Sequence, residues 1–298
     1  MINRRHLLLY LLIAVIVLIF LPIQSEWAET WLYRILLMGP LLVVPVGIQI
    51  LAERFSISIS LNYLYSFISA LLLLLVAYSL PADIFAAALS LPWLLLTILF
   101  ALFTFRNRQF LPLASVLAAS FLPVAAAWMT ADRLGWQPLG FDPVIVLLTG
   151  IHFHYAGFAL ASLTALLPNS TVKDYLSIGL LPGVAGVAIG ITSTQLAGPA
   201  WIEIMGVTTM VTVGIGVAIQ QLRIAWRTST PVLISLLLSF GSIALAGGLS
   251  LALLYGWRFH YQWEWLTIPW MYATHGLLNS LGFTLFSFLG HYQFQTPQ

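Results

Sequence analysis

The 298 residues carry too little charge to build a water-soluble surface. Apolar residues make up 61% of the chain and charged residues 7%, and the mean hydropathy is +1.00. A soluble domain carries about 25% charged residues. Lys and Arg number 11 against 9 Asp and Glu, too few cations for a nucleic-acid-binding surface. The chain has no cysteine, which excludes disulfides, thiolate metal ligands and cysteine nucleophiles.

The apolar residues are arranged in runs of membrane-spanning length. A hydrocarbon core of about 30 Å needs about 20 apolar residues per helix. By that measure the sequence predicts an all-α, polytopic transmembrane helix bundle of about ten spans, and one membrane domain over residues 1–298. The third and fourth spans are the least sharply separated, because Pro81 to Pro92 also fits a re-entrant break. The predicted spans are 6–23, 31–52, 61–80, 84–104, 111–130, 143–166, 175–195, 202–222, 231–254 and 267–289.

The basic residues predict an orientation. If the N-terminus is cytoplasmic, the inside segments hold eight Lys and Arg, and the outside segments hold only Arg34, Arg133 and Arg258. This asymmetry follows the positive-inside rule and predicts that both termini are cytoplasmic. The first span has a basic start but lacks a small-residue cleavage site before Glu26, which favours a retained helix over a signal peptide.

The connections are too short to hold a catalytic domain, so a functional site is expected inside the membrane. Polar and ionisable residues are costly there and need a reason. Three spans supply them. The sixth carries His152, His154 and Tyr155, the eighth begins with Glu203, and the tenth carries His275 and Asn279.

The depth of these residues predicts that they gather in the outer half of the bilayer. At a rise of about 1.5 Å per residue, His152 lies about 14 Å from the outer end of its span, His154 about 17 Å, His275 about 12 Å and Glu203 about 5 Å. Three imidazoles and one carboxylate suit a divalent metal such as zinc or iron. We therefore expect His152, His154, Glu203 and His275 as metal ligands. The expected catalytic residues are His152, His154, Tyr155, His275 and Asn279.

Helical geometry complicates this site. Residues two apart lie about 200° apart around a regular α-helix, so His152 and His154 do not share a face. Either the helix is distorted, as Gly150 and Gly157 would allow, or only one histidine points to a common site. By contrast, His275 and Asn279 are four apart and share a face.

A purely structural explanation is open for each residue. A single buried histidine in a membrane bundle usually hydrogen-bonds a neighbouring helix. Glu203 also fits a solvated carboxylate at the start of its helix, where the helix dipole favours it. We expect His260 and His291 to face solvent. The small residues of the seventh span, and Gly241, Gly247 and Gly248 of the ninth, predict close helix packing.

The two histidine segments also carry a family resemblance. Through His152-Phe153-His154-Tyr155-Ala156-Gly157-Phe158 and His275-Gly276-Leu277-Leu278-Asn279-Ser280-Leu281-Gly282-Phe283, the sequence resembles the YndJ-like family of bacterial membrane proteins, over roughly the fifth to the tenth span. The resemblance implies a bacterial inner-membrane protein in which both histidine helices belong to one recurring design. It implies no reaction.

Three hypotheses for the function follow. The first is a metal-dependent enzyme in the membrane that acts on a lipophilic substrate, with zinc or iron as cofactor. The second is a transporter or channel-like protein for a proton, an ion or a small solute, which would need polar residues in the inner half as well. The third is an accessory subunit whose histidines only pack. All three make the lipid bilayer the partner of the chain, and none involves nucleic acid.

Overall fold

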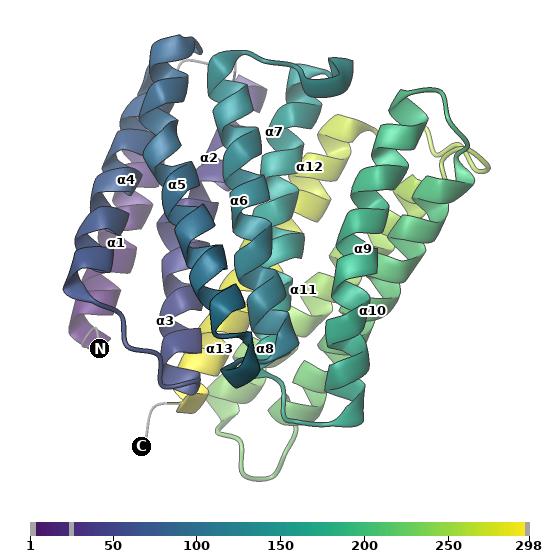
Figure 1. Cartoon of the computed structure of the whole chain (residues 1–298). Helices are drawn as coiled ribbons and strands as arrows, with labels where there is room; N and C mark the ends of the chain where they lie inside the picture. Colours follow the sequence, from purple (N-terminus) through teal and green to yellow (C-terminus); the bar gives the residue numbers. More distant parts are fainter. Residues whose placement is uncertain (1–3, 24–26, 296–298) are drawn as a thin grey trace. The chain divides into compact units, whose positions relative to one another are not determined.

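The computed structural model describes residues 4–23 and 27–295, and every regular element in that part of the chain is helical (Figure 1). Each of the ten predicted spans coincides with a helical segment. Eight of these segments, from residue 30 to Gly256, are long and apolar enough to cross a membrane. The all-helical transmembrane class is therefore confirmed. The count of ten spans and the cytoplasmic position of both termini stay predictions.

The first half of the chain holds five of the predicted spans and the start of the sixth. Its elements are α1 (Arg4–Phe20), α2 (Trp27–Met38), the π-helical segment η1 (Gly39–Val43), α3 (Val44–Arg54), α4 (Leu61–Ser79), α5 (Ile84–Arg106), the short turn η2 (Arg108–Phe110), α6 (Leu113–Leu134), the short turn η3 (Pro138–Gly140), α7 (Pro143–His152) and the π-helical segment η4 (Phe153–Ala159).

The second half completes the sixth span and adds four more helical segments. Its elements are α8 (Leu160–Leu166), α9 (Thr171–Gln195), α10 (Trp201–Ala225), α11 (Val232–Gly256), α12 (Ile268–Leu277), the π-helical segment η5 (Leu278–Leu285) and α13 (Phe286–Gln295). The last three form one continuous helical segment, which is more polar than the others.

The third and fourth spans are two helices joined by a short turn, not a re-entrant break. Helix α4 ends at Ser79, and α5 begins after Asp83. The Asp83 carboxylate accepts a hydrogen bond from the Ala86 N–H at 2.7 Å, which caps the new helix. Pro92 lies within α5. The cap explains why the chain re-enters a helix at this point.

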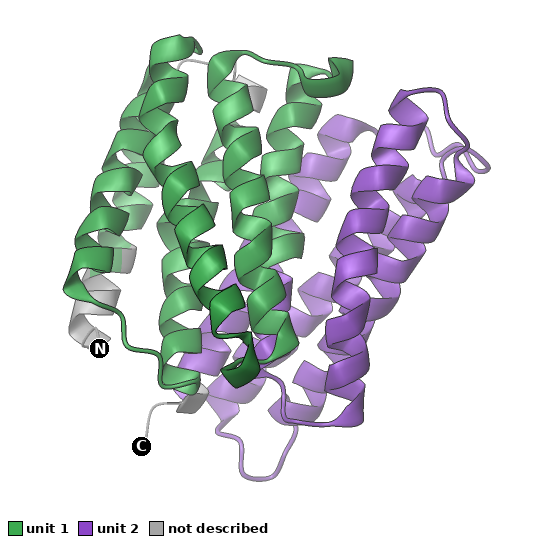
Figure 2. Ribbon diagram, viewed as in Figure 1, with its two compact units in different colours: residues 1–159 green, residues 160–298 purple. Residues whose placement is uncertain are grey.

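The chain divides into two compact units, residues 1–159 and residues 160–298 (Figure 2). The prediction of a single membrane domain is not tested by this division, because one membrane domain often contains two compact halves.

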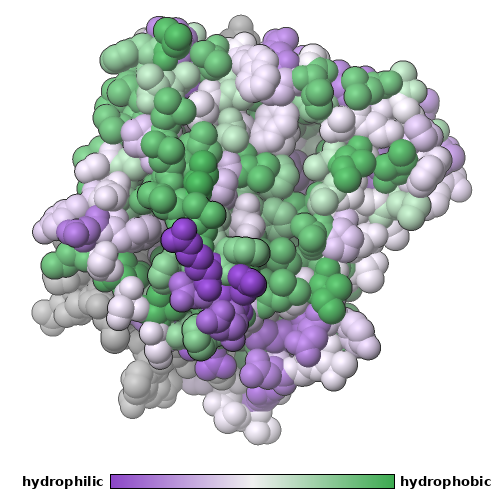
Figure 3. Space-filling model, viewed as in Figure 1, coloured by the Kyte–Doolittle hydropathy of each residue, from purple (hydrophilic) through white to green (hydrophobic). Residues whose placement is uncertain are grey.

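In unit 1, the second helical segment is the most buried. Leu36, Leu37 and Ile50 are fully enclosed, and α6 packs against both α5 and α7. The apolar side chains of α4 and α5 remain exposed over a broad area, including Leu72, Phe85 and others. Figure 3 shows this hydrophobic surface. Exposed apolar area of this extent is what lipid contact requires, and it would be unstable in water.

In unit 2, small residues bring α9 and α10 into close contact. A Cβ atom added to Gly206 would lie 2.3 Å from the Gly186 backbone, and one added to Gly190 would lie 2.3 Å from Glu203 Cα. The packing role predicted for the seventh span is therefore confirmed. Two of the three glycines predicted to pack closely in α11 behave in the same way, since Gly241 lies against Ser287 and Gly248 against Asn279. Gly247 does not, because its added Cβ would make only an ordinary contact with Leu278.

The α9–α10 contact generates a prediction with a matched control. Gly206→Ala is expected to lower the unfolding free energy by about 2 kcal/mol, because its methyl group would overlap backbone atoms that cannot move aside. Gly247→Ala, whose added Cβ would meet only Leu278 Cδ1 at 3.6 Å, is expected to be neutral or slightly stabilising. Unfolding in mixed micelles measures both changes. Equal effects of the two substitutions would contradict the packing described.

Candidate intramembrane histidine site

The sixth helical segment is distorted at its histidines. Helix α7 begins at Pro143 after the Asp142 side chain, which accepts from Val144 N–H at 2.9 Å, and it ends at His152. The next seven residues are the π-helical segment η4. Of the two alternatives left open by the sequence, the distorted helix is therefore correct. Single-turn π-helical stretches inside α-helices are frequently found at functional sites.

His154 is fully buried in unit 1. Its side chain is 0% exposed, and the ring lies against Gly39 of η1, where an added Cβ would approach His154 Cγ to 2.6 Å. The Nδ1 atom lies 2.8 Å from the Gly150 carbonyl oxygen. The Nε2 atom is also buried, and it has no hydrogen-bond partner among the described residues. Only a glycine at position 39 leaves room for this ring.

Tyr155, the next residue, ties the sixth segment to the second. Its hydroxyl donates to the Ile35 carbonyl oxygen at 2.8 Å and is buried. Pro40 follows in η1, and because proline has no N–H, it leaves one carbonyl of the preceding turn without its helical donor. The tyrosine hydroxyl supplies a donor at that turn. The two π-helical segments of unit 1, η1 and η4, contact each other at this place.

His152 and His275 make the same kind of bond as His154. His152 Nδ1 lies 2.7 Å from the Leu148 carbonyl oxygen in unit 1. His275 Nδ1 lies 2.7 Å from the Gly248 carbonyl oxygen in unit 2. Asn279 Nδ2 donates to the His275 carbonyl oxygen at 2.9 Å, and it lies 3.2 Å from His275 Nδ1 and 3.3 Å from His275 Nε2. The sharing of one helix face by His275 and Asn279 is confirmed.

These contacts fix the tautomer of all three histidines. A carbonyl oxygen only accepts hydrogen bonds, so each Nδ1 must carry the proton. In a neutral imidazole, Nε2 is then the basic nitrogen, which carries the in-plane lone pair. A ring held in this way has one orientation and one reactive nitrogen. Metal-bound histidines and catalytic bases are both held by such bonds.

Glu203 does not match the solvated carboxylate that the sequence suggested as its structural role. It is 4% exposed. Its oxygens accept from Arg258 Nη1 at 2.5 Å and Arg258 Nη2 at 3.2 Å, and from the Thr194 hydroxyl at 2.8 Å. Arg258 also lies over the rings of Tyr255 and Phe259. The carboxylate is thus neutralised and joins α9 and α10 to the end of α11.

The predicted metal ligands are distributed over both units, with His152 and His154 in unit 1 and Glu203 and His275 in unit 2. Within the described part of the chain, no three His, Asp or Glu side chains form a group that could hold a metal ion. The predicted metal site and its zinc or iron therefore stay a prediction.

A buried charge cluster in unit 1 was not predicted from the sequence. Asp132 and Arg133 were assigned to an outer connection, but they lie in the last turn of α6, with side chains 8% and 6% exposed. The two side chains form an ion pair at 2.9 Å. Arg133 Nη2 donates to the Tyr33 hydroxyl at 3.0 Å, and the guanidinium lies 4.3 Å from the Tyr78 ring centroid. The cluster joins α2, α4 and α6, and adjacent opposite charges near a helix end were its only sequence signal.

Two histidines outside the candidate site were also assigned to solvent. His260 is exposed, as predicted. His291 is not, because its side chain is 3% exposed in α13. Its position near the end of the last helix suggested solvent, but α13 packs against α11 over much of its length.

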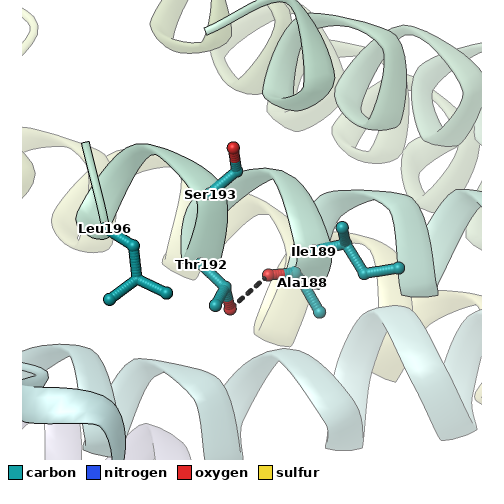
Figure 4. A pocket seen from close by; sticks show the side chains of 5 residues that line it. All are labelled: Ala188, Ile189, Thr192, Ser193 and Leu196. Atoms are coloured by element: carbon teal, nitrogen blue, oxygen red, sulfur yellow. Dashed lines mark hydrogen bonds between the residues drawn. The ribbon is translucent and has the colours of Figure 1, made fainter. Parts of the chain in front are cut away.

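A surface groove on α9 is not part of the candidate site. It is lined by Ala188, Ile189, Thr192, Ser193 and Leu196 (Figure 4). No ionisable side chain lines it, and the Thr192 hydroxyl donates to the Ala188 carbonyl oxygen at 2.8 Å. The groove is therefore suited to contact with lipid, and it has no acid–base group that could take part in a reaction.

The helices, the apolar surface and the buried imidazoles define a polytopic integral membrane protein of the α-helical class. Comparison with known proteins gives the family: residues 34–283 match the model described as YndJ-like protein, and the chain belongs to that family. This confirms the resemblance seen in the two histidine segments and groups the chain with bacterial membrane proteins.

A curated relative agrees with this assignment. The chain is 25% identical over 175 residues to "Uncharacterized membrane protein YndJ" of Bacillus subtilis (strain 168). The aligned part is 57% of this chain and 31% of the relative, so the chain spans about a third of the length of the relative it matches. No solved structure matches the chain.

The Asp132–Arg133 pair generates a prediction. Arg133→Gln is expected to lower the unfolding free energy by about 3 kcal/mol, because it leaves the Asp132 carboxylate buried and unpaired. The matched control is Arg106→Gln, at an exposed arginine at the end of α5, which is expected to have little effect. Thermal unfolding in detergent compares the two. An Arg133→Gln variant as stable as the control would show that the pair does not hold the helices together.

Proposed function

We propose that this protein is a membrane-embedded enzyme in which a buried imidazole acts on a lipophilic substrate such as a lipid, an isoprenoid or a quinone. The observation that carries the proposal is the His154 Nε2 atom, which is buried and has no partner among the described residues. Burying a polar atom without a hydrogen-bond partner in hydrocarbon costs several kcal/mol. In a protein interior the same loss costs about 1–3 kcal/mol. A chain that keeps such an atom at the centre of a span is expected to use it.

The chemistry open to this nitrogen is proton transfer or ligation. With its proton on Nδ1 and bonded to the Gly150 carbonyl, the ring presents a lone pair at Nε2. That lone pair would accept a proton from the hydroxyl of a bound substrate, with the carbonyl stabilising the imidazolium that forms. His152 and Tyr155 lie close to His154 in the sequence. Tyr155 has a supporting role, because its hydrogen bond to the Ile35 carbonyl holds the second segment against the site.

The His275 and Asn279 pair supports a similar role in unit 2. The Gly248 carbonyl orients the ring, and the Asn279 amide nitrogen lies within 3.3 Å of both ring nitrogens. We propose it as a second proton-exchanging group. Gly248 has no side chain, which allows Asn279 to approach this closely.

The metal-dependent form of the enzyme remains a narrower proposal. It assigns His152, His154 and His275 as ligands of zinc or iron through Nε2, which the Nδ1 bonds favour. Glu203 would have to give up its bonds to Arg258 and Thr194 before it could bind the metal. It is therefore the weakest of the four proposed ligands.

Removal of the His154 imidazole tests the enzyme proposal. Lipophilic molecules that co-purify with the protein are extracted and identified by mass spectrometry from the native chain, from His154→Leu, and from His260→Leu as the exposed-histidine control. The native chain and the control are expected to retain a stoichiometric prenyl, quinone or lipid species, and His154→Leu is expected to lose it.

A structural histidine gives the opposite result. His154→Leu would then remove a buried nitrogen that lacks a partner and raise the unfolding temperature, with no change in bound molecules. That outcome would contradict the proposal.

Elemental analysis tests the metal form separately. The purified protein is expected to contain about one equivalent of zinc or iron per chain if the three imidazoles form a site, and His275→Ala is expected to lose it. Absence of metal from the native protein, with no effect of His275→Ala, would remove the metal form and leave the proton-transfer form standing.

Transport is the second candidate function, and one observation favours it. Gln221 is buried near the end of α10 that the charge distribution assigns to the cytoplasm, where a transport path would need polar lining. Flux into proteoliposomes with protons, ions and small neutral solutes tests this function. Failure over the whole panel would count against transport.

A further inference from the structure

Four helices of unit 2 contact one another in a closed cycle. Helix α8 contacts α10 and α13, and α11 contacts the same two helices. All four end or begin at the same side of the unit, where the connections 167–170 and 226–231 lie. A cycle of this kind surrounds an interior, and the residues that face it are given by the packing register.

The register between α10 and α11 places Gln221. A Cβ added to Gly214 would approach Leu249 to 2.3 Å, and one added to Gly256 would approach Val207 to 2.5 Å. The two helices are antiparallel, and Val207 pairs with Gly256 as Gly214 pairs with Leu249, seven residues further along each helix. Another seven residues in the same directions pair Gln221 with Ser242, so Gln221 lies on the face of α10 that meets α11.

The register between α11 and α13 brings Ser287 to nearly the same level. Gly241 lies against the Ser287 hydroxyl, and Gly290 lies against Leu238. Ser287 is thus level with Gly241, one residue from the level of Gln221. Ser239 lies on the neighbouring turn of α11, and Ser162 belongs to the fourth helix, α8.

These four side chains carry polar atoms that the described residues leave without partners. Gln221 is 0% exposed, and neither its amide nitrogen nor its amide oxygen has a hydrogen bond. The hydroxyl oxygens of Ser162, Ser239 and Ser287 are buried and are likewise without a partner. Most other buried hydroxyls of the chain donate to a carbonyl of their own helix, as Ser242 does to Leu238 at 2.8 Å.

So many unmet hydrogen bonds within one membrane helix bundle are not stable in a dry interior. Each buried polar atom without a partner costs roughly 1–3 kcal/mol, and in hydrocarbon there is no solvent to offset it. Buried water typically makes about three hydrogen bonds to such groups. An amide and three hydroxyls supply donors and acceptors but no charge, which suits water and excludes a bare ion as the preferred occupant.

We propose that α8, α10, α11 and α13 enclose a water-filled chamber lined by Ser162, Gln221, Ser239 and Ser287. The chamber opens at the end of unit 2 where α10 meets α11. Exposed Arg223 and Arg227 lie at that end, which the charge distribution predicts to be cytoplasmic. The chamber is independent of the proposed enzyme chemistry, since it uses none of the candidate site residues.

The buried side of the last helical segment indicates how the chamber extends into the membrane. Ser280, Thr284, Ser287 and His291 stand at i, i+4, i+7 and i+11, and all four are at most 3% exposed. They form one buried side of the segment that carries hydroxyl and imidazole groups. Water that enters beside His291 therefore follows this face past Ser287 toward the middle of the membrane.

Cysteine modification tests the chamber directly, because the native chain has no cysteine. Ser162→Cys and Ser287→Cys are each introduced alone and treated in micelles with a small charged methanethiosulfonate reagent. The control is Ser90→Cys, at a serine that is 1% exposed and bonded to the Ala87 carbonyl oxygen and to Thr130. The cysteine thiolate attacks the reagent's sulfenyl sulfur and releases methanesulfinate, and thiolates form only in water. The chamber cysteines are therefore expected to react at least about tenfold faster than the control.

A second substitution links the reaction to the chamber. In the Ser287→Cys variant, Gln221→Leu is expected to slow modification by at least about tenfold, since apolar cavities stay dry. The proposal is overturned if both chamber cysteines are as unreactive as the control, or if Gln221→Leu leaves their rates unchanged. If a cysteine variant fails to fold, Gln221→Leu in the native chain decides. A dry interior predicts a higher unfolding temperature because an unsatisfied amide is removed, and the chamber predicts no gain.

Discussion

The structure depends on one constraint: inside a bilayer, each polar group must find its hydrogen bonds within the protein. Most hydroxyls and imidazoles in the spans meet it by donating to a carbonyl one turn back, as Thr149 does to Ile145 and His154 to Gly150. The charged side chains meet it by pairing, Arg133 with Asp132 and Arg258 with Glu203. Among the described residues, His154 Nε2 and the polar atoms of Ser162, Gln221, Ser239 and Ser287 do not meet it, and function is proposed at these positions.

Glycine and the π-helical segments set where those exceptions occur. Gly39 leaves space for the His154 ring, and Gly248 leaves space for Asn279. In both units the histidine segment changes from α- to π-helical geometry at or just after the histidine. A wider helical turn shifts the direction of the side chains that follow. The family motifs therefore describe a local backbone geometry as well as a set of reactive groups.

The sequence predicted the features that depend on local composition. Apolar runs predicted all ten helical segments, and the spacing of His275 and Asn279 predicted their common face. The distortion at His152 and His154 was one of two alternatives that the sequence left open. It missed the features that depend on distant partners. Arg133 meets Tyr33, and Glu203 meets Arg258, across 100 and 55 residues. Nothing within either segment indicates the pairing, so charges near helix ends were assigned to solvent.

The central claim is that the histidines of the spans present Nε2 as the basic nitrogen, with Nδ1 protonated and bonded to a backbone carbonyl. Solid-state nitrogen NMR of histidine-labelled protein in bilayers measures this directly, with His152→Gln, His154→Gln and His275→Gln variants assigning each signal. At neutral pH all three rings are expected to be neutral with the proton on Nδ1. Signals from rings protonated on Nε2 instead would contradict the account, because the lone pair would then point at a backbone carbonyl and no basic nitrogen would face the site.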